Sequence, residues 1–145
     1  MNIQEESARG FTDLLKRMAM MVKRPEFACM DMKLNSRSFG ILCILGDTPR
    51  PVTMTALAEA AGISSQQLTR LVNELEERGL VRREHNQGNR RLVYVDITEN
   101  GRGVRTEQEE AIMRCVRQLL GRLSEEEQRR LHSSIQCLTE LLEKV

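Results

Sequence analysis

Residues 62–83, GISSQQLTRLVNELEERGLVRR, carry the signals of one short amphipathic helix. Ser64 and Gln67 have the S-x-x-Q spacing of a capping box, in which each residue satisfies a backbone amide at the start of a helix. Gly79 has the position of a glycine that ends a helix. The stretch therefore predicts a helix with a polar first turn and one apolar face, made of Leu68, Leu71, Val72 and Leu75.

A second short helix is expected just before this one. Thr53 is a suitable N-cap for MTALAEAA, residues 54–61, and Gly62 is placed to end that helix in a left-handed conformation. Two short helices joined by a tight turn that contains glycine are typical of a helix-turn-helix.

The periodicity changes after residue 79. The runs LVRREH (80–85) and RRLVYVDIT (90–98) flank the turn-forming cluster NQGN (86–89), and the second run alternates with the period of two that is typical of a strand. A β-hairpin directly after a helix-turn-helix makes a winged helix.

The N-terminal part predicts two further helices. One extends from Ile3 to about Lys23 and is stopped by Pro25, after which residues 24–33 are predicted to be an irregular connection. The next begins after Asn35, a good N-cap. Its buried side chains are expected to be Phe39, Leu42 and Leu45.

The C-terminal part is helical again. Thr98 can cap a long helix, and Ser124 with Glu127 forms a second capping box that opens the last helix. Apolar residues of the last helix alternate steps of four and three, as in a coiled coil, and predict a partner helix. These residues are Leu131, Ile135, Leu138, Leu142 and Val145.

Composition limits the class of protein. The length of 145 residues is typical of one domain. The net charge of +1 is too small for a protein that coats nucleic acid with a uniformly basic surface. Residues 82–105 are locally basic, with six arginines and three carboxylates. No apolar run reaches the roughly 18 residues of a membrane span, and residues 1–10 lack the features of a signal peptide. We therefore expect a cytoplasmic protein with no membrane partner.

Reactive side chains are not grouped as an enzyme or a metal site needs. The four cysteines have no C-x-x-C spacing, and the two histidines lack ligand partners at suitable spacing. Neither a nucleophile–base constellation nor a glycine-rich phosphate loop is found. No enzymatic activity, metal or cofactor is expected.

In order and spacing, three motifs resemble those of the MarR family of bacterial transcription regulators. They are LNSRSFGILCIL (34–45), TMTALAEAAGISSQQLTRLVNELEERGLVRR (53–83) and NRRLVYVDITENGR (89–102). The resemblance implies a mainly α fold with a small β-hairpin wing. It also implies an obligate homodimer that binds double-stranded DNA at a pseudo-palindromic operator, as a repressor relieved by a small-molecule effector or by oxidation.

The resemblance also implies a domain organisation. The chain would be a single domain, residues 1–145, in which a winged helix-turn-helix lobe spans residues 34–103. Residues 1–24 and 104–145 would provide the dimerisation helices. A winged-helix dimer that binds protein instead of DNA is the alternative, but it would need neither amides in the recognition helix nor arginines at the wing tip.

Two interpretations are open for the helix after Ser64. Its polar residues either cap the helix and face solvent, or enter the major groove. Ser65, Gln66 and Gln67 could meet base edges, and Gln66 is the better reader because the cap occupies Gln67. Ser64 and Thr69 suit phosphates, whereas Arg70 suits guanine or phosphate. The predicted DNA-binding residues are Ser64, Ser65, Gln66, Gln67, Thr69, Arg70, Arg90 and Arg91.

The last two of these residues lie at the expected wing tip. A narrow minor groove attracts arginine through its negative potential. In the family pattern Asp-x-Arg, the aspartate supports the arginine that enters this groove. Here Arg91 holds the arginine position, Arg90 precedes it, and Asn89 replaces the aspartate and cannot supply the carboxylate.

Cys29 is the candidate for a redox site. Peroxide-sensing members of the family keep a reactive cysteine near the N-terminus, and Lys23, Arg24 and Lys33 could lower the pKa of this thiol. The tyrosines that accompany such a cysteine are missing, because the one tyrosine, Tyr94, belongs to the expected wing. A buried, reduced cysteine is the alternative.

Overall fold

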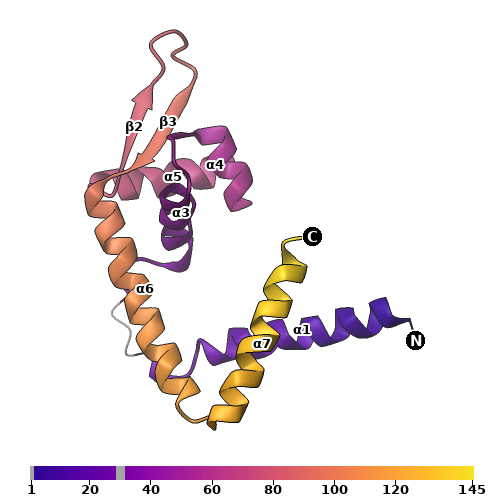
Figure 1. The fold of residues 1–145 in the computed structure, drawn as a ribbon. Helices are drawn as coiled ribbons and strands as arrows, with labels where there is room; N and C mark the ends of the chain where they lie inside the picture. The colour runs from indigo at the N-terminus through magenta and orange to yellow at the C-terminus, as the bar shows by residue number, and fades with distance from the viewer. Residues whose placement is uncertain (1, 29–31) are drawn as a thin grey trace. The chain divides into compact units, whose positions relative to one another are not determined.

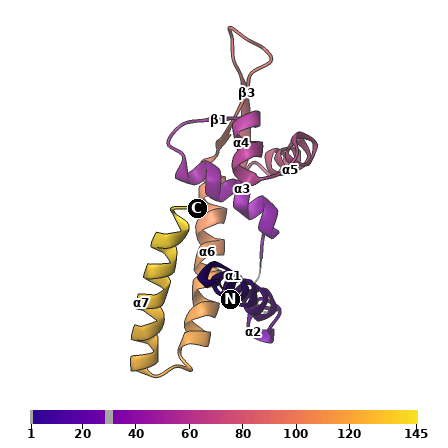
Figure 2. The same cartoon turned by 90° about the vertical axis from the view of Figure 1, so that its right-hand side faces the viewer.

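The structure is a computed structural model that describes residues 2–28 and 32–145. They form two compact units, one comprising residues 31–111 and the other the two ends of the chain, residues 1–30 and 112–145. The elements are numbered in chain order and labelled in Figure 1, except α2 and β1, which are labelled in Figure 2. The elements are α1 (Ile3–Met21), α2 (Pro25–Ala28), α3 (Ser36–Asp47), β1 (Val52–Thr53), α4 (Met54–Ala61), α5 (Ser65–Glu77), β2 (Val81–His85), β3 (Val93–Ile97), α6 (Glu99–Leu120) and α7 (Glu125–Leu142).

The unit of residues 31–111 is a winged helix. Helices α3, α4 and α5 pack around one apolar core, and β2 and β3 extend from it as an antiparallel hairpin (Figure 1). Strand β1 adds to the free edge of β3, which gives the sheet order β1-β3-β2. The core side chains with no exposed surface at all are Leu42, Leu57, Leu68, Val72 and Val95.

Side-chain caps position the helices of this unit as the sequence predicts. The side chain of Asn35 accepts a hydrogen bond from the backbone N–H of Ser38 at 2.9 Å, and that of Thr53 accepts one from Ala56 at 3.2 Å. Gly62 has φ 64° and ψ 33°, a left-handed conformation that a residue with a Cβ rarely adopts. The turn between α4 and α5 is therefore the tight turn expected of a helix-turn-helix.

The start of α6 packs closely on the turn between α5 and β2. The hydroxyl of Thr98 donates to the carbonyl oxygen of Gly79 at 2.6 Å and accepts from the backbone N–H of Gly101 at 3.0 Å. A Cβ on Gly101 would lie 2.1 Å from the carbonyl oxygen of Leu80. Only glycine allows this approach without a backbone shift.

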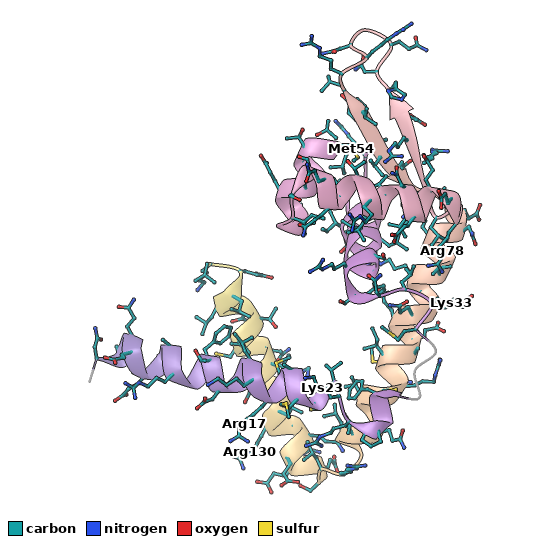
Figure 3. The ribbon with its side chains drawn as sticks, turned by 180° about the vertical axis from the view of Figure 1, so that it is seen from behind. Arg17, Lys23, Lys33, Met54, Arg78 and Arg130 are labelled. Atoms are coloured by element: carbon teal, nitrogen blue, oxygen red, sulfur yellow. The ribbon has the colours of Figure 1, made fainter. Side chains whose placement is uncertain are left out.

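A second set of contacts ties the segment before α3 to α6 and α5. Gln108 is 2% exposed, and its amide bonds both backbone groups of Leu34, accepting from N at 3.0 Å and donating to O at 3.2 Å. Arg78, just after α5, donates to the carbonyl oxygen of Lys33 at 2.9 Å, and the two residues are neighbours in Figure 3. The Lys33 ammonium also pairs with Glu107.

Two expectations about these segments were wrong in detail, and one short strand was not predicted. Residues 24–33 do not form an irregular connection throughout, because Pro25 begins the one-turn helix α2, where proline is tolerated. Strand β1 was not predicted, since two residues cannot show a period of two. Phe39 packs against the core but is only half-buried, whereas Ile41 is buried.

The unit formed by the two ends of the chain has little apolar interior of its own. Neither α1 nor α7 has a buried residue. Figure 2 shows α7 turning back after the end of α6. The capping box predicted at Ser124 and Glu127 opens α7. Large apolar side chains are exposed on both helices: Phe11, Leu14, Leu15, Met18 and Met20 on α1, and Ile135, Leu141 and Leu142 on α7.

Candidate nucleic-acid interface

The capping box at the start of α5 uses two of the predicted DNA-binding residues. The hydroxyl oxygen of Ser64 accepts from the backbone N–H of Gln67 at 3.2 Å, and Oε1 of Gln67 accepts from the backbone N–H of Ser64 at 3.1 Å. The side chain of Gln66 makes no hydrogen bond among the described residues. Gln66 is therefore available to an outside partner, whereas Gln67 is occupied by the cap.

The outer face of α5 carries polar side chains of different lengths that can donate hydrogen bonds. Leu68, Leu71, Val72 and Leu75 face the core, and the opposite line of the helix carries Gln66, Arg70 and Asn73, all exposed. Ser65 is exposed in the first turn, and the Thr69 hydroxyl donates to its carbonyl oxygen at 2.8 Å. This face has the polar composition of a surface that contacts base edges and phosphates.

Strand β2 supplies an arginine that is held against this helix. The guanidinium of Arg83 bonds Oε1 of Glu76 at 3.1 Å and Oδ1 of Asn73 at 2.6 Å. Its backbone N–H also donates to Oε2 of Glu76 at 2.9 Å. Arg83 is not among the residues that the sequence predicts to bind DNA. Strand alternation could have placed Arg83 on the inward face with Val81, but it names no partner on α5.

The wing tip is organised by two asparagine side chains. Oδ1 of Asn86 accepts from the backbone N–H groups of Gly88 at 2.8 Å and Asn89 at 3.2 Å. Oδ1 of Asn89 in turn accepts from the backbone N–H of Arg91 at 3.0 Å. Arg90 and Arg91 are exposed, with no ion pair in the part of the chain that the structure describes. The tip thus presents two guanidinium groups on a backbone fixed by hydrogen bonds.

Other arginines near the wing are already paired. Arg82 lies 3.1 Å from Asp96 and 3.5 Å from Glu84. Arg105 bonds Asp47 at 2.8 Å and Glu109 at 2.9 Å, and these bonds raise the pKa of its guanidinium above the ordinary value. Among the arginines of residues 82–105, Arg90 and Arg91 at the wing tip and Arg102 on α6 therefore have no ion pair in the described part of the chain.

The described residues give the predicted redox site less support than they give the DNA-binding surface. Cys29 lies outside the described residues. Lys33, one of the cations expected to lower the pKa of its thiol, is paired with Glu107. Burial raises the pKa of the Cys43 thiol, which makes that group a weaker nucleophile at neutral pH. Among the described residues, no group of three or more His, Cys, Asp or Glu side chains is placed to hold a metal ion.

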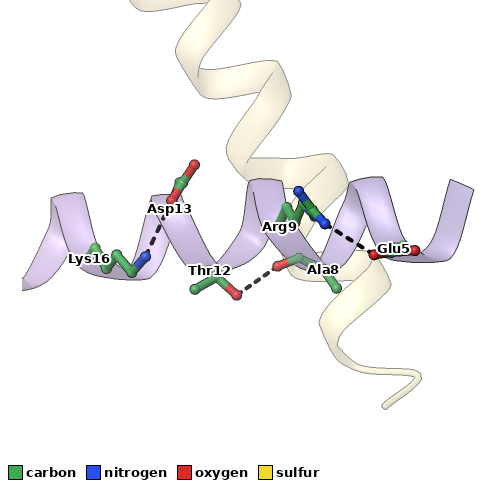
Figure 4. Close-up of a pocket in the computed structure, with 6 residues that line it drawn as sticks. All are labelled: Glu5, Ala8, Arg9, Thr12, Asp13 and Lys16. Carbon is green, nitrogen blue, oxygen red and sulfur yellow. Dashed lines mark hydrogen bonds and ion pairs between the residues drawn. The ribbon is translucent and has the colours of Figure 1, made fainter. Parts of the chain in front are cut away.

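One shallow hollow lies along a single face of α1 (Figure 4). Its polar side chains bond within the helix: Arg9 to Glu5 at 3.2 Å, Lys16 to Asp13 at 3.6 Å, and the Thr12 hydroxyl to the carbonyl oxygen of Ala8 at 2.7 Å. Pairs three or four residues apart are ordinary features of a solvated helix. The hollow therefore does not indicate a ligand site.

Comparison with known proteins supports the DNA-binding interpretation of this winged helix. A family model described as MarR family matches residues 32–92. The transcriptional regulator HosA of Escherichia coli O127:H6 is 33% identical over 95 residues, which cover 66% of this chain and 70% of HosA. The chain belongs to the MarR family.

A solved structure extends the similarity to the whole chain, and a second relative matches part of it. The crystal structure of the transcriptional regulator BldR from Sulfolobus solfataricus matches all of both chains with a TM-score of 0.72 and 26% identity. A putative transcriptional regulatory protein for the hcr operon of Thauera aromatica is 30% identical over 89 residues, or 61% of this chain. The chain spans about half of that relative, 53% of its length.

These similarities place the observed elements within the MarR pattern. The mainly helical fold with a small antiparallel sheet and wing is that of the family, as predicted. The relatives are transcriptional regulators, a non-enzymatic role, and none of them favours the alternative of a winged-helix module without DNA binding. No helix within the described ranges is long and apolar enough to cross a membrane.

Proposed function

We propose that the protein is a sequence-specific transcription regulator that binds a pseudo-palindromic operator as a homodimer. Helix α5 enters the major groove, and the wing tip reaches the adjacent minor groove. The contrast between free and paired side chains supports this most directly. Gln66, Arg70, Arg90 and Arg91 have no partner among the described residues, whereas Arg82 and Arg83 are held by carboxylates.

The proposed contacts divide by their chemistry. Gln66 and Ser65 read base edges, because an amide or hydroxyl in the first turn of a recognition helix is suited to hydrogen bonds in the major groove. Ser64 contacts the phosphate backbone, which fixes register, and Thr69 does so once its hydroxyl turns from the carbonyl oxygen of Ser65. Arg70 contacts guanine or phosphate. Gln67 supports the first turn through its cap. Arg90 and Arg91 supply the charge that a narrow minor groove attracts.

The dimer is proposed from the exposed apolar side chains of α1 and α7. Soluble proteins rarely leave such extended apolar surface without a partner. Leu131 and Leu138 are half-buried on α7, and Ile135 between them is 50% exposed. A second copy of the chain would cover this surface and would place two recognition helices on one operator.

Control by a small-molecule effector or by oxidation, as a repressor, is proposed from family membership. If Cys29 is the sensor, peroxide should weaken operator binding, reductant should restore it, and Cys29→Ser should respond to neither. Binding that is unchanged by peroxide would leave a diffusible ligand as the signal.

The experiment for the proposed function is selection of binding sites from a random duplex library, followed by footprinting. We expect an inverted repeat with half-site centres about 34–36 Å apart, one turn of DNA. Wild-type protein that enriches no sequence would contradict sequence-specific binding. A single asymmetric half-site would contradict the dimeric mode.

A further inference from the structure

Asn73 in α5 makes a contact that fixes how its side chain faces outward. Nη2 of Arg83 lies 2.6 Å from Oδ1 of Asn73, and the same guanidinium is anchored on Glu76 at 3.1 Å. A guanidinium has donors and no acceptor, so the oxygen of the amide must be the atom that faces it. The usual ambiguity between the oxygen and nitrogen of an asparagine is thereby removed.

The consequence is that Asn73 offers a donor to any outside partner. Its Nδ2 has no acceptor among the described residues, and the residue is exposed. An asparagine that pairs with adenine uses its oxygen and its nitrogen together. Here Oδ1 is held toward the Arg83 guanidinium by a charge-assisted hydrogen bond, whereas both hydrogens of Nδ2 are unused among the described residues, so the nitrogen is the group of this amide that we assign to an outside partner.

The position of Asn73 places this donor with the proposed DNA contacts. Steps of four and three residues connect Gln66, Arg70 and Asn73 along one line of the helix, opposite the buried leucines. The next residue on that line is Glu77, whose carboxylate would repel phosphate. Asn73 is therefore the last residue of this line with a side chain suited to DNA.

We propose that Asn73 is a specificity-determining residue of the winged helix and that Arg83 positions it. The amide nitrogen donates to the acceptors of a major-groove base edge, which favours guanine, with N7 and O6, over adenine. Arg83 does not touch DNA in this proposal. This inference rests on the proposed DNA-binding function and adds a base preference to it.

The competing explanation is that the Asn73–Arg83 bond only ties the wing strand to α5. The substitution Asn73→Asp separates the two explanations. An aspartate keeps an oxygen for Arg83 and so preserves the tie, but it has no donor. Its added negative charge weakens binding to every duplex alike, so the measurement must be the preference among bases at each position of the site.

The experiment compares sites selected from a random duplex library by the wild type, Asn73→Asp and Asn73→Ala. Asn100→Ala is the matched control, because Asn100 is an exposed asparagine outside α5. We expect one position in each half-site at which the wild type and the control prefer guanine by roughly 5- to 150-fold, the range of one good base contact. Both Asn73 variants should lose that preference and keep the others.

Arg83→Lys tests the positioning role. A lysine can pair with one carboxylate but lacks the planar fork that reaches Glu76 and Asn73 together. We expect a weakened guanine preference at the same position and unchanged preferences elsewhere. Thermal melts of each variant monitor folding, and Asn73→Asp should melt close to the wild type.

The outcomes distinguish this inference from the proposed function. If the wild type selects an inverted repeat and Asn73→Asp retains every base preference, Asn73 is a structural tie only and the inference is wrong. Selection of adenine at the Asn73-dependent position would overturn the donor assignment. A wild type that selects nothing would overturn the proposed function and this inference with it.

Discussion

Replacing Gln108 by leucine should destabilise the winged-helix unit although leucine is similar in size and apolar. Both Gln108 and Leu34 are 2% exposed, so water cannot replace the two hydrogen bonds that join them. The substitution removes both bonds at once, the one at 3.0 Å and the one at 3.2 Å. It leaves the backbone N–H and C=O of Leu34 buried without a partner.

Two opposing effects determine the size of the loss. Each buried backbone group left unpaired costs about 1–3 kcal/mol, or roughly 2–6 kcal/mol for the two. Burying a leucine side chain returns about 1.5–3 kcal/mol. Taking the middle of each range, about 4 kcal/mol for the unpaired groups against about 2 kcal/mol for the apolar gain, the free energy of unfolding should fall by about 2 kcal/mol.

The measurement is urea unfolding followed by circular dichroism, with all variants at one protein concentration because dimerisation contributes to apparent stability. Gln118→Leu is the matched control, since Gln118 is exposed on the same helix. The control should lie within about 0.5 kcal/mol of the wild type. Equal stability of Gln108→Leu and the wild type would refute the argument that the Gln108 amide is needed to satisfy Leu34.

Three further predictions concern DNA, the dimer and a thiol. Gln66→Ala should lose about 1–3 kcal/mol of binding free energy on the selected operator and little on random DNA. Arg91→Ala should weaken binding to both duplexes and lower the slope of log affinity against log salt concentration by about one unit, as measured by an anisotropy titration. Leu138→Glu should shift the dimer toward monomer in light scattering, because the interface would have to bury a charge. Iodoacetamide should label exposed Cys137 before Cys43, since burial raises the pKa of the Cys43 thiol; equal labelling rates would contradict this protection.

Local signals explain why much of the fold could be predicted from the sequence. The caps at Asn35, Thr53, Ser64 and Ser124 each involve residues three positions apart, and the structure contains each of them. The hairpin could be located because the pattern of apolar residues changes after α5 from a helical period to a period of two, which is also a local signal. Interactions of this kind are fixed by neighbours along the chain and do not depend on how distant segments meet.

Long-range contacts explain what was missed. Gln108 bonds a residue 74 positions away, and nothing around it in the sequence marks it as buried. Arg83 looks like one more basic residue of a polar strand until its partners on α5 are known. The free or paired state of each arginine depends on such contacts. The sequence could therefore list the candidate DNA-binding residues but could not show which arginines are paired and with which partners.

The structure shows what Asn89 does in place of the family aspartate. The concern was that an asparagine cannot pair with the arginine that enters the minor groove. Its Oδ1 instead holds the backbone N–H of Arg91, while Asn86 holds two other amides of the same turn. The turn is therefore ordered without a carboxylate, and the guanidinium of Arg91 is not engaged by an anion that DNA would have to displace. Asn89→Asp should keep the turn, add a negative charge beside Arg91, and weaken binding to random and selected duplexes alike in the anisotropy titration. Tighter binding by Asn89→Asp would show instead that support of the guanidinium outweighs the cost of the added charge.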